Sequence, residues 1–141
     1  MNKRNCSIFE LVNEDREKYY NYAQKGDIII TKNSPYSAAI VENDEKYLVN
    51  DNCFILKIDK NKIDPYYILA FLSSKKLIRS INTNALSIKK LNSLPINLHS
   101  LEEVEKISYE MKNIIKNLED IYENFSKLDF RRENIFDTYK K

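Results

Sequence analysis

The chain has 141 residues, of which 43% are hydrophobic and 31% are charged, and its formal net charge is +2 at pH 7. This length allows one modest domain with little beyond it, and no apolar run approaches the roughly 18 residues that cross a membrane. Two cysteines, Cys6 and Cys53, and one histidine, His99, exclude a disulfide framework and a zinc site built from one chain. The N-terminus has no secretory signal pattern, so we expect a cytoplasmic protein without a membrane segment, metal or cofactor.

The first half of the chain predicts a helix followed by short strands. Asn13 is a candidate N-cap for a helix that runs to Tyr22, and Gly26, the single glycine, stands where a left-handed residue ends such a helix. Four apolar, β-branched runs follow, with Asn- and Asp-rich turns between them. They predict a meander of four short strands at 27–31, 38–41, 47–49 and 53–58.

The middle of the chain predicts further helices. Asp64 before Pro65 is the pattern of an N-cap followed by proline at the first helical position, and it opens a helix over 65–78 that an Asn-Thr-Asn segment ends. A short element covers residues 88–94, and residues 95–98 form an extended connector. Helix, strands, helix and long helix in this order are typical of an α+β fold.

The last part of the chain, from Ser100 to about residue 140, predicts one long helix. Ser100 and Glu103 form a capping-box pattern, and neither proline nor glycine follows. Apolar residues then recur in alternating steps of four and three, which is the seam of a coiled coil. The seam consists of Ile107, Met111, Ile114, Leu118, Ile121, Phe125 and Leu128, Ile135 continues it, and Val104, Ile115 and Tyr122 widen it.

Two interpretations of this helix are open. It is either an ordinary core helix with a frayed end, or a rod of roughly 55 to 60 Å that projects from a small domain and docks on another helix. The second interpretation divides the chain into a partial α+β domain at 1–99 and a dimerisation or spacer helix at 100–141.

Positive charge is concentrated in one segment. Residues 65–101 contain no Asp or Glu but five basic residues, namely Lys75, Lys76, Arg79, Lys89 and Lys90. Such a segment projects a positive potential and is the usual mark of a phosphate-binding surface, although a solvated basic face gives the same pattern.

Catalytic patterns are weak in this sequence. A single glycine cannot build a phosphate-binding loop, and His99 has no nucleophile pattern beside it. Asp27 followed by Asp44-Glu45-Lys46 imitates the carboxylates of metal-dependent nucleases, but Asp44 and Glu45 fall in a turn, where Asp is favoured for its geometry. We therefore expect no enzyme.

Four motifs follow in register between about residues 20 and 130. They are GDIIIT at 26–31, NCFILKI at 52–58, IDPYYILAFLSS at 63–74, and LPI at 94–96 before LEE at 101–103. Together they resemble the DNA specificity domain of type I restriction-modification systems. In that family a GDILI strand, an F-x-L strand, a D-x-x-YL helix and a PLP…LEEQ-x-x-I entry into a long helix follow in this order. Val104 stands where the family has Gln, and residues 33–35 replace a loop glycine.

The resemblance implies a non-catalytic target-recognition domain for double-stranded DNA. Its long helix would pair with that of a second specificity chain, or of a second copy in a homodimer, and would dock on the methyltransferase (modification) subunit. We expect the chain to lack the N-terminal half of a family domain, as a half-subunit that dimerises, a complementing fragment or a relic would. The alternative is an assembly or regulatory protein that binds a partner subunit through the helix without reading DNA.

The predicted DNA contacts combine the first loop with the basic segment. They are Lys32, Asn33, Ser34, Tyr36, Lys75, Lys76, Arg79, Lys89 and Lys90. Lysine and arginine would mainly hold phosphates, whereas Asn33 and Tyr36 would reach base edges. Tyr36 fits a half-buried loop aromatic equally well.

Overall fold

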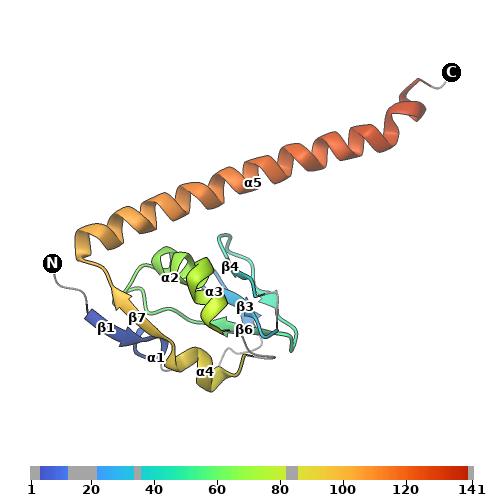
Figure 1. Cartoon of the computed structure of the whole chain (residues 1–141). Helices are drawn as coiled ribbons and strands as arrows, with labels where there is room; N and C mark the ends of the chain where they lie inside the picture. The colour runs from blue at the N-terminus through green and yellow to red at the C-terminus, as the bar shows by residue number, and fades with distance from the viewer. Residues whose placement is uncertain (1–3, 13–21, 34–35, 82–85, 140–141) are drawn as a thin grey trace.

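The computed structural model describes residues 4–12, 22–33, 36–81 and 86–139 (Figure 1). Its elements are β1 (Arg4–Ser7), α1 (Ile8–Leu11), β2 (Tyr22–Ala23), β3 (Ile28–Thr31), β4 (Ala38–Ile40), β5 (Tyr47–Leu48), β6 (Cys53–Leu56), α2 (Pro65–Leu72), α3 (Lys75–Ile81), α4 (Ile88–Ser93), β7 (Pro95–Leu98) and α5 (Leu101–Thr138). This order of short strands, helices and one long C-terminal helix confirms the predicted α+β class. Within the described ranges, no helix is long and apolar enough to span a membrane.

The described strands form three small antiparallel sheets, so the predicted meander is wrong in its connections. β3 lies between β4 and β6 in the central sheet, β2 pairs with β5, and β1 pairs with β7. Both residues of β5 are exposed. Because β5 has no buried face that would hold it in the central sheet, the chain leaves that sheet after β4 and returns to it as β6.

Residues 95–98 are also more than a connector. They form β7, which pairs with β1 from Arg4 opposite Leu98 to Ser7 opposite Pro95. β1 and β2 were not predicted, because each is short and its pairing partner lies far away in the sequence. The sequence pattern of a single short strand does not contain that partner.

Gly26 has a φ of 91°, so its predicted left-handed conformation is confirmed, but its setting differs. Most of the predicted helix from Asn13 falls at 13–21, outside the described residues, and Tyr22 lies in β2. Gly26 lies in the turn between β2 and β3, where its N–H donates to the Val41 carbonyl at 2.8 Å. A Cβ at this position would come within 2.7 Å of the Cε of Lys60, but that atom is near the end of a flexible side chain, so it is the positive φ that favours glycine.

The predicted cap of the middle helix is confirmed. The Asp64 carboxylate accepts the Tyr66 N–H at 2.8 Å, and Pro65 occupies the first helical position. The helix expected over 65–78 is two helices, α2 and α3, because Ser73 and Ser74 interrupt it. Serine hydroxyls compete for backbone hydrogen bonds and so favour caps over helix interiors.

The main core lies between the central sheet and the short helices. Its largest fully buried side chains come from α1, β3, β6, α2, α3, α4 and β7, namely Ile8, Leu11, Ile28, Ile30, Leu56, Ile68, Leu69, Ile81, Leu91 and Ile96. α5 adds the buried Val104 and the partly buried Ile107, Met111 and Ile115, and it packs mainly against α2. Beyond these turns the helix extends well past the globular part (Figure 1).

Candidate functional site

Two backbone hydrogen bonds at Lys32 join three segments at one end of the central sheet. The Lys32 N–H donates to the Asn52 carbonyl at 2.9 Å, and the Lys32 carbonyl accepts the Leu86 N–H at 2.6 Å. The loop after β3, the turn before β6 and the approach to α4 therefore lie side by side. We call the described residues 32–33, 50–52 and 86–90 of these segments the loop cluster.

The loop cluster lies at the opposite end of β3 from α5. β3 begins beside Gly26, which lines a cavity against the first turns of α5, and it ends at Thr31, directly before Lys32. The globular domain thus separates a loop-rich end from the end that holds the long helix.

The first-loop residues have different surroundings. Lys32 is half-buried and places its Nζ 4.7 Å from the centroid of the Phe54 ring, while Asn33 is exposed. Tyr36 is half-buried and packs against the main core, as the loop-aromatic interpretation predicts. Ser34 lies outside the described residues.

The basic segment divides between two helices. Lys75, Lys76 and Arg79 are exposed on α3, whereas Lys89 is exposed and Lys90 half-buried on α4. The ion pairs that the described residues form involve none of these five side chains. Because the Leu86 N–H donates to the Lys32 carbonyl, the chain directly before α4 lies beside the first loop.

The turn before β6 adds residues that the sequence analysis did not select. Asn50 and Asn52 are both exposed, and the Asn50 Oδ1 accepts the Asn52 N–H at 2.8 Å. An Asn-Asp-Asn turn gives no signal beyond turn geometry. The pairing of Thr31 with Cys53 and the bond between Lys32 and Asn52 place this turn beside the predicted loop.

The predicted helix interface divides into two parts. Ile107 and Met111 pack on the domain, whereas the exposed fractions are 44% for Ile114, 55% for Leu118 and 62% for Phe125. Ile121, Tyr122 and Leu128 are exposed as well. The interpretation of α5 as an ordinary core helix is therefore wrong for the residues after Ile115, where an apolar stripe faces solvent.

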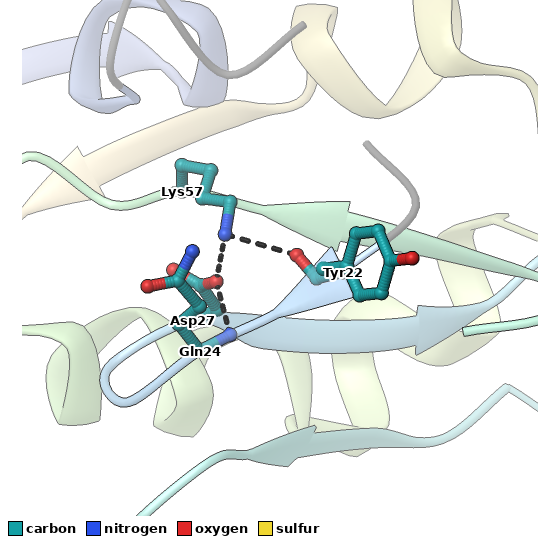
Figure 2. A network of polar contacts seen from close by, with 4 residues as sticks. All are labelled: Tyr22, Gln24, Asp27 and Lys57. Atoms are coloured by element: carbon teal, nitrogen blue, oxygen red, sulfur yellow. Dashed lines mark hydrogen bonds and ion pairs between the residues drawn. The ribbon is translucent and has the colours of Figure 1, made fainter. Parts of the chain in front are cut away.

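A buried ion pair, also missed from the sequence, links the residue directly after β6 to the residue directly before β3 (Figure 2). The Lys57 ammonium contacts the Asp27 carboxylate and donates to the Tyr22 carbonyl at 3.1 Å, and both charged residues are 7% exposed. Asp27 also accepts the Gln24 N–H at 2.7 Å. Its carboxylate is thus committed to Lys57 and Gln24, which removes the nuclease-like pattern. No cluster of metal-ligating side chains occurs among the described residues.

A cavity of about 830 Å³ lies between the first turns of α5, the start of α2 and the end of β4. On its wall the Tyr66 hydroxyl donates to Glu42 at 2.5 Å, and the Lys112 ammonium lies 5.8 Å from the Tyr66 ring centroid. Burial, followed by the bond to Glu42, raises the pKa of Tyr66 above its usual value. Ser108 also lines the cavity, and its buried hydroxyl has no hydrogen-bond partner among the described residues.

The small domain presents polar loops and helices with exposed basic residues, and the projecting helix α5 carries an apolar stripe. These features define a binding module with one long projecting helix. Residues 2–125 match the family described as the type I restriction modification DNA specificity domain. The chain belongs to this family. No curated protein matches it significantly.

Two solved structures share the fold. One, from work on complex assembly and conformational transition of the type I R-M system, has a TM-score of 0.54 and 18% identity over 82% of this chain and 29% of that chain. The other, the HsdS subunit from Thermoanaerobacter tengcongensis, has a TM-score of 0.60 and 15% identity over 86% of this chain and 39% of that chain. This chain thus spans less than half the length of either structure.

Proposed function

We propose that the chain is a non-catalytic DNA-binding specificity module that reads double-stranded DNA through the loop cluster and the basic faces of α3 and α4. The observation that carries this proposal is the convergence at Lys32 of two exposed asparagine-bearing loops and the lysine-bearing start of α4. Family membership supports it, because the family is that of a DNA specificity domain. A cytoplasmic location follows from the same proposal.

Different residue types have different proposed roles at this surface. Lys75, Lys76, Arg79 and Lys89 are exposed cations suited to phosphates, and phosphate contacts set position and affinity rather than sequence. Asn33 and Asn52 offer amides that match the N6 and N7 edge of adenine. We propose that these two asparagines supply the sequence preference.

We propose that the exposed stripe on α5 mediates assembly. Burying one large apolar side chain contributes about 1.5 to 3 kcal/mol, and the stripe exposes Ile114, Leu118, Ile121, Phe125 and Leu128 in one row. The occupant is the α5 of a second copy or of another specificity chain, in antiparallel array. The methyltransferase subunit would then dock on the paired helices. One of the similar structures comes from work on complex assembly of the type I R-M system.

A salt titration of DNA binding tests the proposal. A DNA reader releases counterions, so its affinity should fall steeply as salt rises, while a preference for selected sequences over random duplexes remains. Asn33→Ala with Asn52→Ala should reduce that preference but leave the salt slope unchanged. If the protein shows neither a slope nor a preference, the assembly protein that does not read DNA is the better description.

A further inference from the structure

The junction between β7 and α5 holds a paired contact that the proposed function does not use. Tyr67, on α2, is 3% exposed, and His99 stands between β7 and α5. The His99 backbone N–H donates to the Tyr67 hydroxyl oxygen at 3.2 Å, and that oxygen lies 2.7 Å from His99 Nδ1. The two rings meet edge to face, with 5.8 Å between centroids and an interplanar angle of 82°.

The Tyr67 oxygen accepts the His99 backbone N–H and also forms a hydrogen bond with Nδ1 of the same residue. In that second bond the tautomer of the imidazole decides which group donates. Burial raises the pKa of Tyr67, so the phenol stays protonated and remains able to donate.

Because this pair lies at the base of α5, a small change of angle there becomes a large displacement at the far end of the helix. β7 ends at Leu98 and α5 begins at Leu101, so His99 and Ser100 alone form the bend between them. α5 has 38 residues, which correspond to about 57 Å of helix. A tilt of about 10° at the base would move the far end by about 10 Å, which equals about three base pairs along DNA.

Packing on the domain restrains α5 unevenly. Val104, Ile107, Met111 and Ile115 pack on the core, but the cavity of about 830 Å³ flanks the same turns on another side. The unpartnered Ser108 hydroxyl lines that side, so no polar contact of this side chain ties the helix there. Side-chain packing therefore leaves α5 room to tilt toward the cavity.

We propose that Tyr67 and His99 form a latch that fixes the direction in which α5 leaves the domain, and that both are positioning residues. The latch acts at the bend itself, where the smallest displacement controls the largest movement at the far end. Its consequence for the distance between two DNA half-sites rests on the proposed function, whereas the fixed direction of the helix does not.

Distances between two nitroxide labels test the latch without DNA and without pairing. Labels on Lys76→Cys and Lys127→Cys, both at exposed positions, report the direction of α5 relative to the domain. Cys53→Ser removes the half-buried thiol, Cys6 is only 6% exposed, and Leu118→Glu with Phe125→Glu keeps the protein monomeric. Circular dichroism and thermal melting verify that each variant is folded.

Tyr67→Phe and His99→Leu should each broaden the distance distribution and shift its centre by several ångströms, up to about 10 Å. His99→Asn should restore the narrow distribution, because its side-chain amide stands near the position of Nδ1 and can either accept a hydrogen bond from the Tyr67 hydroxyl or donate one to it. Unchanged distributions in Tyr67→Phe and His99→Leu would overturn the latch, as would a broad distribution in His99→Asn. If the unmodified protein does not bind DNA in a separate binding assay, the measured label distances still test the latch. That failure would count against the proposed function alone.

Discussion

The two parts of α5 share one sequence pattern but have opposite surroundings. Val104, Ile107, Met111 and Ile115 pack on the domain and complete its core, whereas from Leu118 to Leu128 the same spacing leaves side chains in solvent. Helical periodicity therefore identifies an apolar face without identifying what covers it. The docked part belongs to the stability of the domain, and the projecting part is available to another chain.

The largest expected effect concerns the projecting part. Leu118→Glu with Phe125→Glu should convert a pair of chains to monomers, because two carboxylates would be buried in an apolar interface. Light scattering or sedimentation at tens of micromolar measures this, and melting of the domain should be nearly unchanged. Asn113→Glu with Asn124→Glu, exposed positions off the stripe, is the matched control and should still pair. A monomeric unmodified chain would contradict homodimerisation and leave a different subunit as the partner.

A second prediction destabilises the globular domain without changing the projecting part of α5. Lys57→Met leaves the buried Asp27 carboxylate without its charged partner, and breaking such a pair costs about 3 to 5 kcal/mol of unfolding free energy. Denaturant unfolding should show this loss. Replacing both residues, as Lys57→Met with Asp27→Leu, should recover part of it because no isolated charge remains. An unchanged free energy in the single variant would show that solvent reaches this site.

Charge reversal of Lys75, Lys76 and Arg79 to Glu compares the contribution of the globular domain to DNA affinity with that of α5. We expect DNA affinity to fall about tenfold to a hundredfold for all sequences alike, and the salt slope to flatten by roughly one unit for each phosphate that the variant no longer neutralises. The control reverses Lys106, Lys116 and Lys127, which are exposed on α5. Equal reductions in affinity in both triple variants would point to net charge instead of a defined surface.

The smallest expected effect is the difference in free energy of unfolding between two alanine variants of α5. Ile107→Ala, in the docked part, should lower the free energy of unfolding by about 1 to 2 kcal/mol, because its side chain packs on the core. Leu118→Ala, in the projecting part, should change it by less than about 0.5 kcal/mol when measured on the monomer. Similar reductions in both would mean that the domain covers more of α5 than the exposed fractions indicate.

The predictable part of the candidate site depended on residues that are close in sequence. The cap at Asp64, the capping box at Ser100 and the extent of α5 follow from hydrogen bonds between residues two to four positions apart. The four motifs, found in the expected order, predicted the family, and the match over residues 2–125 confirms that prediction. The contacts of the predicted DNA-binding residues remain predictions.

The sequence alone determined the N-termini of α2 and α5, the left-handed Gly26 and three strands of the central sheet, because local hydrogen bonds and periodicity encode them. The four ordered motifs identified the family. The tertiary structure decided the pairings of β1 with β7 and of β2 with β5, the partner of Lys57, and the convergence of three loops on Lys32. It also decided where along α5 the core ends. Lys57 and Asp27 are 30 positions apart, and any of several side chains satisfies the same local pattern. Only the packed chain selects which distant groups meet, because that choice depends on closing many loops at once.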